Sequence, residues 1–431
     1  MIRLWCEHAW LPDGPTPSVA VDVVDGRIAA LTPGAPREGT VLDGLTVPGL
    51  RNRHSHAFHR ALRGRSSAAG SFWTWREGMY GVAAALDPDG YRRLATAVYA
   101  EMALAGFTEV TEFHYLHHRG DGTPHEDSVA MGRALVDAAR DAGLRITLLD
   151  TCYLAGGFGT PLAGTQIRFG DADATTWARR ADRLAALDDG DRVRVGAAVH
   201  SVRAVPRDAL PTVAAWARGR PLHVHLSEQP AENVACLEAY GATPTAVLDD
   251  AGVLGPDTTV VHATHLTDDD VTRLARSGAR ACFCPTTERD LGDGIGPASA
   301  LADAGIGLCL GSDSHAVIDP FEEMRALEMH ERLRGGVRGR FTPSELLAAG
   351  TDGATITVGA PADLVTVDTR SVRTAGARPG GVLPDGVLLA ASAADVHDVH
   401  VGGRAVVRGG VHQLIDRPAE RLAAAIEAVT A

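Results

Sequence analysis

The middle of the chain alternates between short apolar runs and alanine-rich segments, and this alternation constrains the fold more than any other feature. The segments between the runs, such as 90–105, 128–142 and 267–277, have helical periodicity. Repeated strand–helix alternation predicts a parallel sheet, and about eight units predict its closure into a barrel. The expected strands are Thr46–Leu50, Thr108–Phe113, Arg145–Tyr153, Arg194–Val199, Pro221–Leu226, Thr259–His262, Ala279–Phe283 and Ile306–Gly311.

A doubly wound open sheet is the main alternative for such a pattern. No Gly-x-Gly-x-x-Gly motif follows the first expected strand, which argues against a dinucleotide-binding sheet. We therefore expect an α/β fold whose core is a (β/α)8 TIM barrel over residues 47–352.

Both ends of the chain are instead rich in short β runs broken by turns. They predict one small β-sandwich domain, built from residues 1–46 and 353–417, followed by a C-terminal helix over 418–431. The runs are Ser18–Val24, Arg27–Leu31, Ala362–Val367, Asp398–Val401 and Arg404–Val407, with Asp25-Gly26 and Gly402-Gly403 as turn signals.

Charge and composition exclude several classes of partner. The formal net charge is −13 and no basic run appears, so a nucleic-acid surface is not expected. No apolar stretch approaches the roughly 20 residues that a membrane span needs. The start of the sequence lacks a signal-peptide pattern, and the six scattered cysteines include no Cys-x-x-Cys pair. We expect a cytoplasmic protein that acts on a small molecule.

Lysine is absent, and all 41 basic side chains are arginines. This excludes Schiff-base chemistry, a P-loop lysine and a carbamylated lysine bridging two metal ions. A metal site in this chain is therefore expected to hold one ion.

Polar side chains follow four of the expected strands at the point where each strand stops. His54 and His56 follow the first strand, and an i, i+2 pair on extended backbone points the same way. His225 follows the fifth strand, His262 ends the sixth, and Asp313 follows the eighth. In parallel barrels these carboxyl ends meet at one face, where catalytic residues gather.

Taken one at a time, these residues also have structural explanations: a polar loop, a core histidine bonded to a carbonyl, or a helix-capping aspartate. Together, the three imidazoles of His54, His56 and His225 and the Asp313 carboxylate suit one zinc-like ion with a position left for water. Iron and manganese accept the same ligands. Glu228 is a candidate general acid or base, and Asp313 with His262 a candidate proton acceptor and its partner.

The sequence resembles the amidohydrolase superfamily in its mononuclear deaminase branch. The terminal stretches "VGAPADLVTVD" at Val358–Asp368 and "HVGGRAVVRGG" at His400–Gly410 resemble the β-domain return of these enzymes. Within the branch, the chain is most similar to formimidoylglutamate deiminases of bacterial histidine breakdown. Four stretches carry this: "PGLRNRHSHAFHRALRG" at Pro48–Gly64, "SFWTWREGMY" at Ser71–Tyr80, "HSVRAV" at His200–Val205 and "HVHLSEQ" at His223–Gln229.

The resemblance implies roles for individual residues. It implies that zinc is bound by His54, His56, His225 and Asp313. It implies that protons are moved by Glu228 and His262. The substrate site is implied to be lined by His59, Arg76, Tyr115, His200 and Arg203. His59 departs from the family, which usually has glutamine there, so substrate contacts are open at this position. Homodimers are common in the family, and a homodimer is expected here.

The implied reaction is hydrolysis of N-formimidoyl-L-glutamate to N-formyl-L-glutamate and ammonia. This substrate carries two carboxylates, for which Arg76 and Arg203 offer bidentate forks; surface ion pairs are the alternative explanation of both arginines. Two other interpretations of the function stay open. One is a related enzyme acting on a purine, pterin or triazine, and the other is a barrel without catalytic activity.

Overall fold

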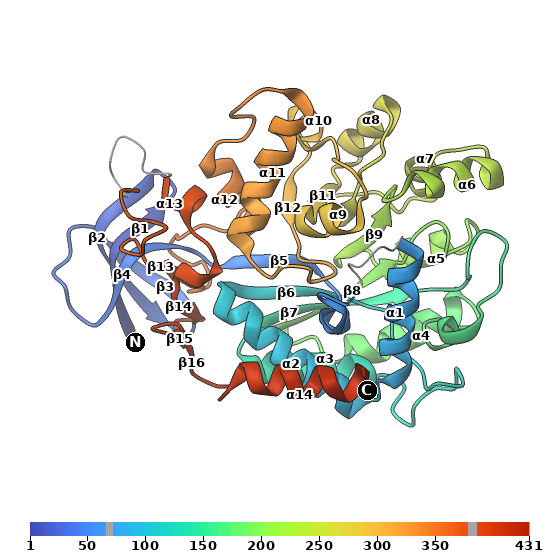
Figure 1. Cartoon of the computed structure of the whole chain (residues 1–431), viewed down its shortest axis with the longest axis horizontal. Helices are drawn as coiled ribbons and strands as arrows, with labels where there is room; N and C mark the ends of the chain where they lie inside the picture. Colours follow the sequence, from blue (N-terminus) through green and yellow to red (C-terminus); the bar gives the residue numbers. More distant parts are fainter. Residues whose placement is uncertain (66–71, 378–385, 431) are drawn as a thin grey trace.

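The computed structural model describes residues 1–65, 72–377 and 386–430. Eight parallel strands, in the order β5 to β12, form a nearly closed barrel surrounded by helices (Figure 1). This confirms the TIM-barrel prediction. The strands are β5 Leu50–Ser55, β6 Phe107–His114, β7 Arg145–Cys152, β8 Val193–Val199, β9 Leu222–Leu226, β10 Thr258–His262, β11 Arg280–Phe283 and β12 Leu308–Leu310.

The barrel closes where the end of β12 meets β5. The backbone N–H groups of Ser312 and Asp313 donate to the carbonyl of His54 at 3.1 and 2.9 Å, and His56 N–H donates to the Asp313 carbonyl at 3.2 Å. Gly311 permits this approach, because a Cβ there would lie 2.7 Å from the Cβ of His54. The closure therefore brings Asp313 beside the two histidines of β5.

Helices follow the barrel strands, and several begin at a capping residue. Thr267, for example, caps α8 with a reciprocal hydrogen bond from its own backbone to Asp270. None of the helices within the described ranges is long and apolar enough to cross a membrane. The helices are α1 Phe72–Ala85, α2 Pro88–Ala105, α3 Ala130–Ala142, α4 Ala174–Ala185, α5 Leu210–Trp216, α6 Pro230–Tyr240, α7 Pro244–Asp250, α8 Asp268–Ser277, α9 Pro285–Leu291, α10 Ala298–Asp303, α11 Pro320–Gly335, α12 Pro343–Thr351, α13 Gly386–Ala390 and α14 Pro418–Thr430, with 3-10 turns η1 Ala57–Leu62, η2 Gly164–Arg168 and η3 Ala393–Asp395.

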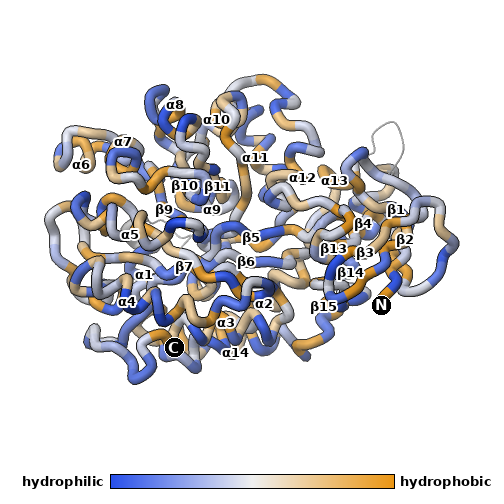
Figure 2. The backbone as a smooth tube through the Cα atoms, turned by 180° about the vertical axis from the view of Figure 1, so that it is seen from behind, coloured by the Kyte–Doolittle hydropathy of each residue, from blue (hydrophilic) through white to orange (hydrophobic). Residues whose placement is uncertain are grey.

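Strands from both ends of the chain form a second eight-stranded sheet, which fits the predicted β-sandwich domain. Its order is β16-β15-β14-β13-β4-β1-β2-β3, so β4 and β13 join the N-terminal and C-terminal strands. Hydrophobic residues alternate with hydrophilic ones along these strands (Figure 2). The strands are β1 Ile2–Leu11, β2 Gly14–Val24, β3 Arg27–Thr32, β4 Thr40–Pro48, β13 Leu364–Val367, β14 Val396–Val401, β15 Arg404–Arg408 and β16 Val411–His412.

This second sheet has its own core and also packs on the barrel. Leu4, Val21, Ile28 and Leu42 belong to a separate buried cluster within the sheet. Strands β4, β13, β14 and β15 instead contribute residues such as Val47 to the core that they share with the barrel. The last helix, α14, leaves the sheet and lies along α2 (Figure 1).

The first barrel strand differs from the prediction of Thr46–Leu50. Residues 46–48 end β4 and pair with β13, whereas the barrel strand is Leu50–Ser55. The sequence of this strand is polar, and the structure accommodates its charges in ion pairs. Arg51 Nε lies 3.4 Å from Glu109, and Arg53 Nε lies 3.3 Å from Asp352. Apolar periodicity could not find a strand whose charges are paired in this way.

Gly49 is the single residue of chain between β4 of the second sheet and β5 of the barrel. Its N–H donates to the Asp363 carbonyl at 2.8 Å, and a Cβ at this position would meet the Thr108 hydroxyl at 2.3 Å. The close approach requires glycine. The chain therefore enters the barrel directly from β4, which leads straight into the histidines at the end of β5.

Candidate functional site

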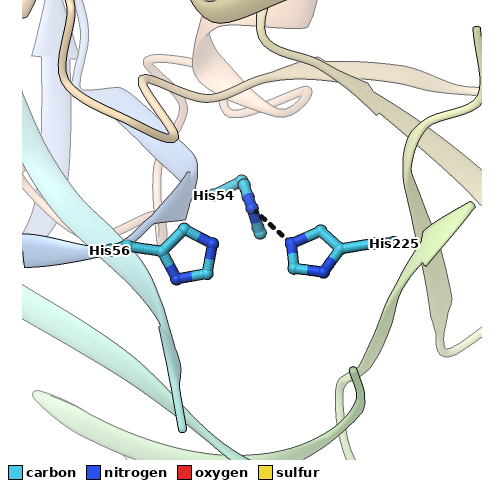
Figure 3. Close-up of side chains that lie close together, drawn as sticks. All are labelled: His54, His56 and His225. Atoms are coloured by element: carbon cyan, nitrogen blue, oxygen red, sulfur yellow. Dashed lines mark hydrogen bonds between the residues drawn. The ribbon is translucent and has the colours of Figure 1, made fainter. Parts of the chain in front are cut away.

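Three histidine rings converge at the carboxyl ends of β5 and β9 (Figure 3). The Nε2 atoms of His54 and His225 are 3.1 Å apart. The Oδ1 atom of Asp313 lies 3.3 Å from His54 Nε2 and 3.4 Å from His56 Nε2. All four side chains are buried, and the three histidines offer ligand atoms within 4.8 Å of one another. These four residues could hold one metal ion.

Backbone carbonyls orient two of the rings. Nδ1 of His56 donates to the Phe113 carbonyl at 2.9 Å, and Nδ1 of His225 donates to the His200 carbonyl at 2.9 Å. Since a carbonyl can only accept, the proton of each neutral ring is on Nδ1 and the lone pair of Nε2 faces the shared centre. This is the arrangement by which proteins present imidazole to a metal ion.

The charges at the centre also suit a cation. Burial lowers the pKa of His56 to about 3 and that of His225 well below its usual value, so both rings are neutral. Burial alone would raise the pKa of Asp313, but the hydrogen bond from His54 and the nearby charges of His54 and His262 hold it well below its usual range. Neutral imidazoles with an ionised carboxylate form the donor set that a divalent ion binds.

His262 at the end of β10 lies among carboxylates. Its Nε2 is 3.8 Å from Oε1 of Glu228 and 3.8 Å from Oδ2 of Asp313, while its Nδ1 is 3.4 Å from Oε1 of Glu288. Burial lowers the pKa of His262, but these carboxylates together raise it to about 10. Burial raises the pKa of Glu228. The site thus holds a protonatable carboxyl beside a positively charged imidazole.

Two carboxyl groups at this site were not predicted from the sequence. Glu288 accepts from Cys284 N–H at 2.8 Å as well as contacting His262. Asp293 accepts a hydrogen bond from Gln229, and burial together with the Glu228 charge raises its pKa to about 8. The signal available for Glu288 was its place in the first turn of a helix that directly follows an apolar strand.

Unusual backbone conformations gather around the same centre. In the described ranges, five of the nine non-glycine residues with positive φ lie at or just after the ends of barrel strands: Ser227 at 50°, His262 at 69°, Ala263 at 49°, Asp313 at 40° and His315 at 58°. This conformation costs roughly 1–3 kcal/mol at a non-glycine residue and persists only where the surroundings impose it. The packing around the site therefore determines where His262 and Asp313 point.

A cavity opens beside the histidine cluster. It is lined by His56, His59, Trp75, Arg76, Met79, Tyr80, Tyr115, Tyr153, Phe169, His200, Arg203, His225, Glu228, His262, Leu291 and Asp313. All residues predicted to line the substrate site are present, and His54 contacts the same cluster. The structure thus brings together every residue that the sequence analysis placed in the site. Met79, Tyr80, Tyr153, Phe169 and Leu291 were not predicted, because pocket walls carry no motif.

The polar lining residues are held by specific contacts. Nε2 of His59 lies 2.7 Å from the Tyr115 hydroxyl, so this imidazole makes a side-chain hydrogen bond. Arg203 Nε donates to Glu232 Oε1 at 3.3 Å, and Arg76 Nε donates to the Tyr80 hydroxyl at 2.6 Å.

The sequence profile of the Amidohydrolase family matches residues 45–406. The chain belongs to the amidohydrolase family. It is 37% identical to formimidoylglutamate deiminase of Pseudomonas aeruginosa over 97% of both chains. The structure superposes on a crystal structure of an amidohydrolase from Brucella melitensis with a TM-score of 0.91, at 33% identity and 100% coverage of both chains.

A more distant structure shares the fold. It is an adenosine deaminase from Xanthomonas campestris with bound zinc, with a TM-score of 0.85, 22% identity and coverage of 99% of this chain and 97% of that one. The similarity to named deaminases of the family identifies this chain as a hydrolase that acts on C–N bonds.

Proposed function

We propose that the protein hydrolyses N-formimidoyl-L-glutamate to N-formyl-L-glutamate and ammonia, with one divalent ion held by His54, His56, His225 and Asp313. The observation that carries this proposal is the placement of Arg76 and Arg203 in the cavity that opens on the histidine cluster. The 37% identity to a formimidoylglutamate deiminase over nearly the whole chain supports the same substrate.

Zinc is the proposed ion. The residues fit it because the Nε2 lone pairs of His56 and His225 face the centre and Asp313 supplies a charged oxygen. When bound, such an ion makes a water molecule nucleophilic at neutral pH. Every described basic side chain in this chain is arginine or histidine, so a second, lysine-bridged ion is not part of the proposal.

The surrounding side chains move the protons in the proposed reaction. Asp313 takes the proton of the attacking water, and the nearby His262 keeps that carboxylate oriented and ionised. Glu228, whose pKa burial raises, carries a proton and delivers it to the departing nitrogen. Protonation matters because ammonia leaves far more easily than an amide ion. His262 also stabilises the charge that develops on the atoms bound to the reacting carbon.

The substrate side of the cavity is proposed to bind the two carboxylates. Arg76 and Arg203 supply the positive charges, while the Tyr115 hydroxyl and the rings of His59 and His200 supply hydrogen-bonding groups. Charge-assisted hydrogen bonds of this kind are roughly twice as strong as neutral ones. Neutral heteroaromatic substrates, as in the purine, pterin or triazine alternatives, have no use for two guanidinium groups.

Ammonia release by the purified, zinc-loaded protein tests the proposal. Formimidoylglutamate, adenosine, guanine and cytosine are compared at equal concentrations. We expect kcat/KM for formimidoylglutamate to exceed that for each nucleobase compound by at least about 100-fold, the size of effect expected from two charge-assisted contacts. Equal or faster release from a purine would overturn the assignment. Loss of the bound metal with full retention of activity would overturn the metal-dependent mechanism.

A further inference from the structure

Part of the cavity wall is built from segments other than the strand ends that carry the histidine cluster. Three separate segments contribute: helix α1, the start of the loop after β6, and the residue that follows η2. We call these residues the outer wall; they are Trp75, Arg76, Met79, Tyr80, Tyr115 and Phe169. The proposed carboxylate-binding residue Arg76 belongs to it.

The ring of Phe169 lies where these segments meet. Its centroid is 5.1 Å from that of Tyr115 and 6.0 Å from that of Tyr80. Aromatic contacts at these distances depend on offset or edge-to-face geometry and are lost when the backbone moves by a few ångströms. The outer wall therefore needs something that holds its three backbones in place.

Arg168, the residue before Phe169, makes that connection. Its Nε donates to the His118 carbonyl at 3.0 Å, its Nη2 donates to the Leu86 carbonyl at 2.7 Å, and its Nη1 donates to the Ala83 carbonyl. In return, the Arg168 carbonyl accepts the backbone N–H groups of His117 and His118 at 3.0 and 2.9 Å. One residue thus ties the end of α1 and the loop after β6 to η2.

The chemistry of these contacts suits arginine. The last turn of a helix leaves carbonyl groups without partners and carries partial negative charge, which a cation at that end stabilises. Arg168 is 3% exposed, and burial lowers the pKa of its guanidinium, which still remains protonated at neutral pH. Its planar fork reaches three carbonyls at once, whereas a lysine would offer one ammonium group on a flexible stem.

We infer that Arg168 is a positioning residue that sets the geometry of the outer wall, and with it substrate affinity, without acting on the metal centre. The proposed metal ligands lie at the ends of β5, β9 and β12, and within the described parts of the chain Arg168 has no hydrogen bond to any of them. For the identity of the substrate, this inference rests on the proposed function.

Steady-state kinetics of Arg168→Met and Arg168→Lys test the inference. Misplacing binding groups by about 1 Å can cost up to 100-fold, so we expect KM for formimidoylglutamate to rise at least about tenfold in Arg168→Met. We expect kcat at saturation to stay within about threefold and zinc content to be unchanged, with Arg168→Lys intermediate in KM. Unchanged KM, or zinc lost together with kcat, would overturn the inference.

Arg145→Met is the matched control. Arg145 is also a buried arginine, but its Nε contacts Asp363 at 2.7 Å and its Nη1 contacts Asp191 at 2.9 Å, remote from the cavity lining. We expect this variant to lower the melting temperature and leave KM unchanged. A similar rise of KM in both variants would mean that general destabilisation, not positioning, explains the effect.

Hydrogen exchange measured by mass spectrometry separates this inference from the proposed substrate. In Arg168→Met, peptides from the second half of α1 and from residues 115–119 should exchange faster, while peptides of β9 and β12 stay unchanged. Should the wild-type protein release no ammonia from formimidoylglutamate, the proposed function fails, but the exchange pattern still decides the role of Arg168. Unchanged exchange in α1 would refute that role.

Discussion

Nε2 of His54 and Nε2 of His225 lie 3.1 Å apart, although the two residues are 171 positions apart in the sequence. Two buried ring nitrogens at this distance need either a shared proton or a cation between them. Among the described residues, the Nδ1 atom of His54 has no hydrogen-bond partner, and that of His225 donates to a carbonyl. With the Asp313 oxygen 3.3 Å from His54 Nε2, a cation satisfies the arrangement better than a proton.

Removing one of these rings should remove the metal. In His225→Ala the proposed site loses one of its four ligands, so bound zinc should fall to a small fraction of the wild-type content, measured by elemental analysis after dialysis. His223→Asn is the control, since His223 lies two residues earlier in the same buried strand and is not among the clustered ligand atoms. Equal zinc in wild type and His225→Ala would exclude His225 as a ligand.

Asp313→Asn should lower kcat by about a thousandfold or more, because asparagine cannot accept the water proton. Asparagine tolerates the left-handed conformation that Asp313 adopts at φ 40°, so the backbone should be preserved. Circular dichroism and the melting temperature check this, and Asp303→Asn at an exposed ion pair is the control. Turnover near the wild-type level would remove Asp313 from the mechanism.

Glu228→Gln should reduce kcat by about 10²–10⁴-fold and change KM little, because an amide cannot deliver a proton to the leaving nitrogen. The measurement is saturation kinetics at several pH values. Glu322→Gln on α11 is a comparison, as this carboxylate pairs with Arg289 away from the cavity. A variant whose kcat equals that of the wild type would contradict the shuttle role.

Arg203→Met should raise KM by about 10–100-fold through loss of a charge-assisted hydrogen bond. The substitution also leaves the buried Glu232 without its cation, which is destabilising by itself. The double variant Arg203→Met/Glu232→Gln removes that complication and should keep the raised KM. Arg207→Met, at an exposed ion pair with Asp250, should leave KM as it is. If only the single variant is impaired, Arg203 acts through Glu232 and not on substrate.

Protonation of His400 in the second sheet should make the fold sensitive to mild acid. Burial lowers the pKa of His400 from 6.5 to about 4. Between these values the unfolded chain binds a proton that the folded chain does not, so the stability present above pH 6.5 is lost as pH falls toward 4. The loss from this residue is at most about 3 kcal/mol, the free energy of that pKa difference.

Denaturant unfolding at pH 7, 6, 5 and 4 measures this effect. We expect His400→Leu to weaken the dependence of unfolding free energy on pH across this window, since leucine has no proton to bind. His397→Leu is the comparison, because the neighbouring His397 is half exposed and pairs with Asp398. An equally steep pH dependence in wild type and His400→Leu would show that other groups are responsible.

Strand positions were predictable wherever the barrel strand is an apolar run. Seven of the eight expected strands, from Thr108–Phe113 to Ile306–Gly311, overlap the strands of the structure. The first, Thr46–Leu50, lies mostly in β4 and shares only Leu50 with the barrel strand β5, because β5 contains Arg51 and Arg53, whose charges are balanced by residues distant in sequence. The histidine cluster was still found, since the His-x-His spacing and the order of polar residues after the strands are local features.

The sequence alone determined the alternating pattern, the absence of lysine and the order in which His54, His56, His225 and Asp313 follow successive apolar runs. These are local properties, because hydrophobic periodicity and strand direction follow from neighbouring residues. Only the tertiary structure decided that Glu288 contacts His262 and that Arg168 joins α1 to the loop after β6. Such contacts depend on buried polar groups finding partners across the fold, and the free energy of burying them depends on three-dimensional distances that no sequence spacing encodes.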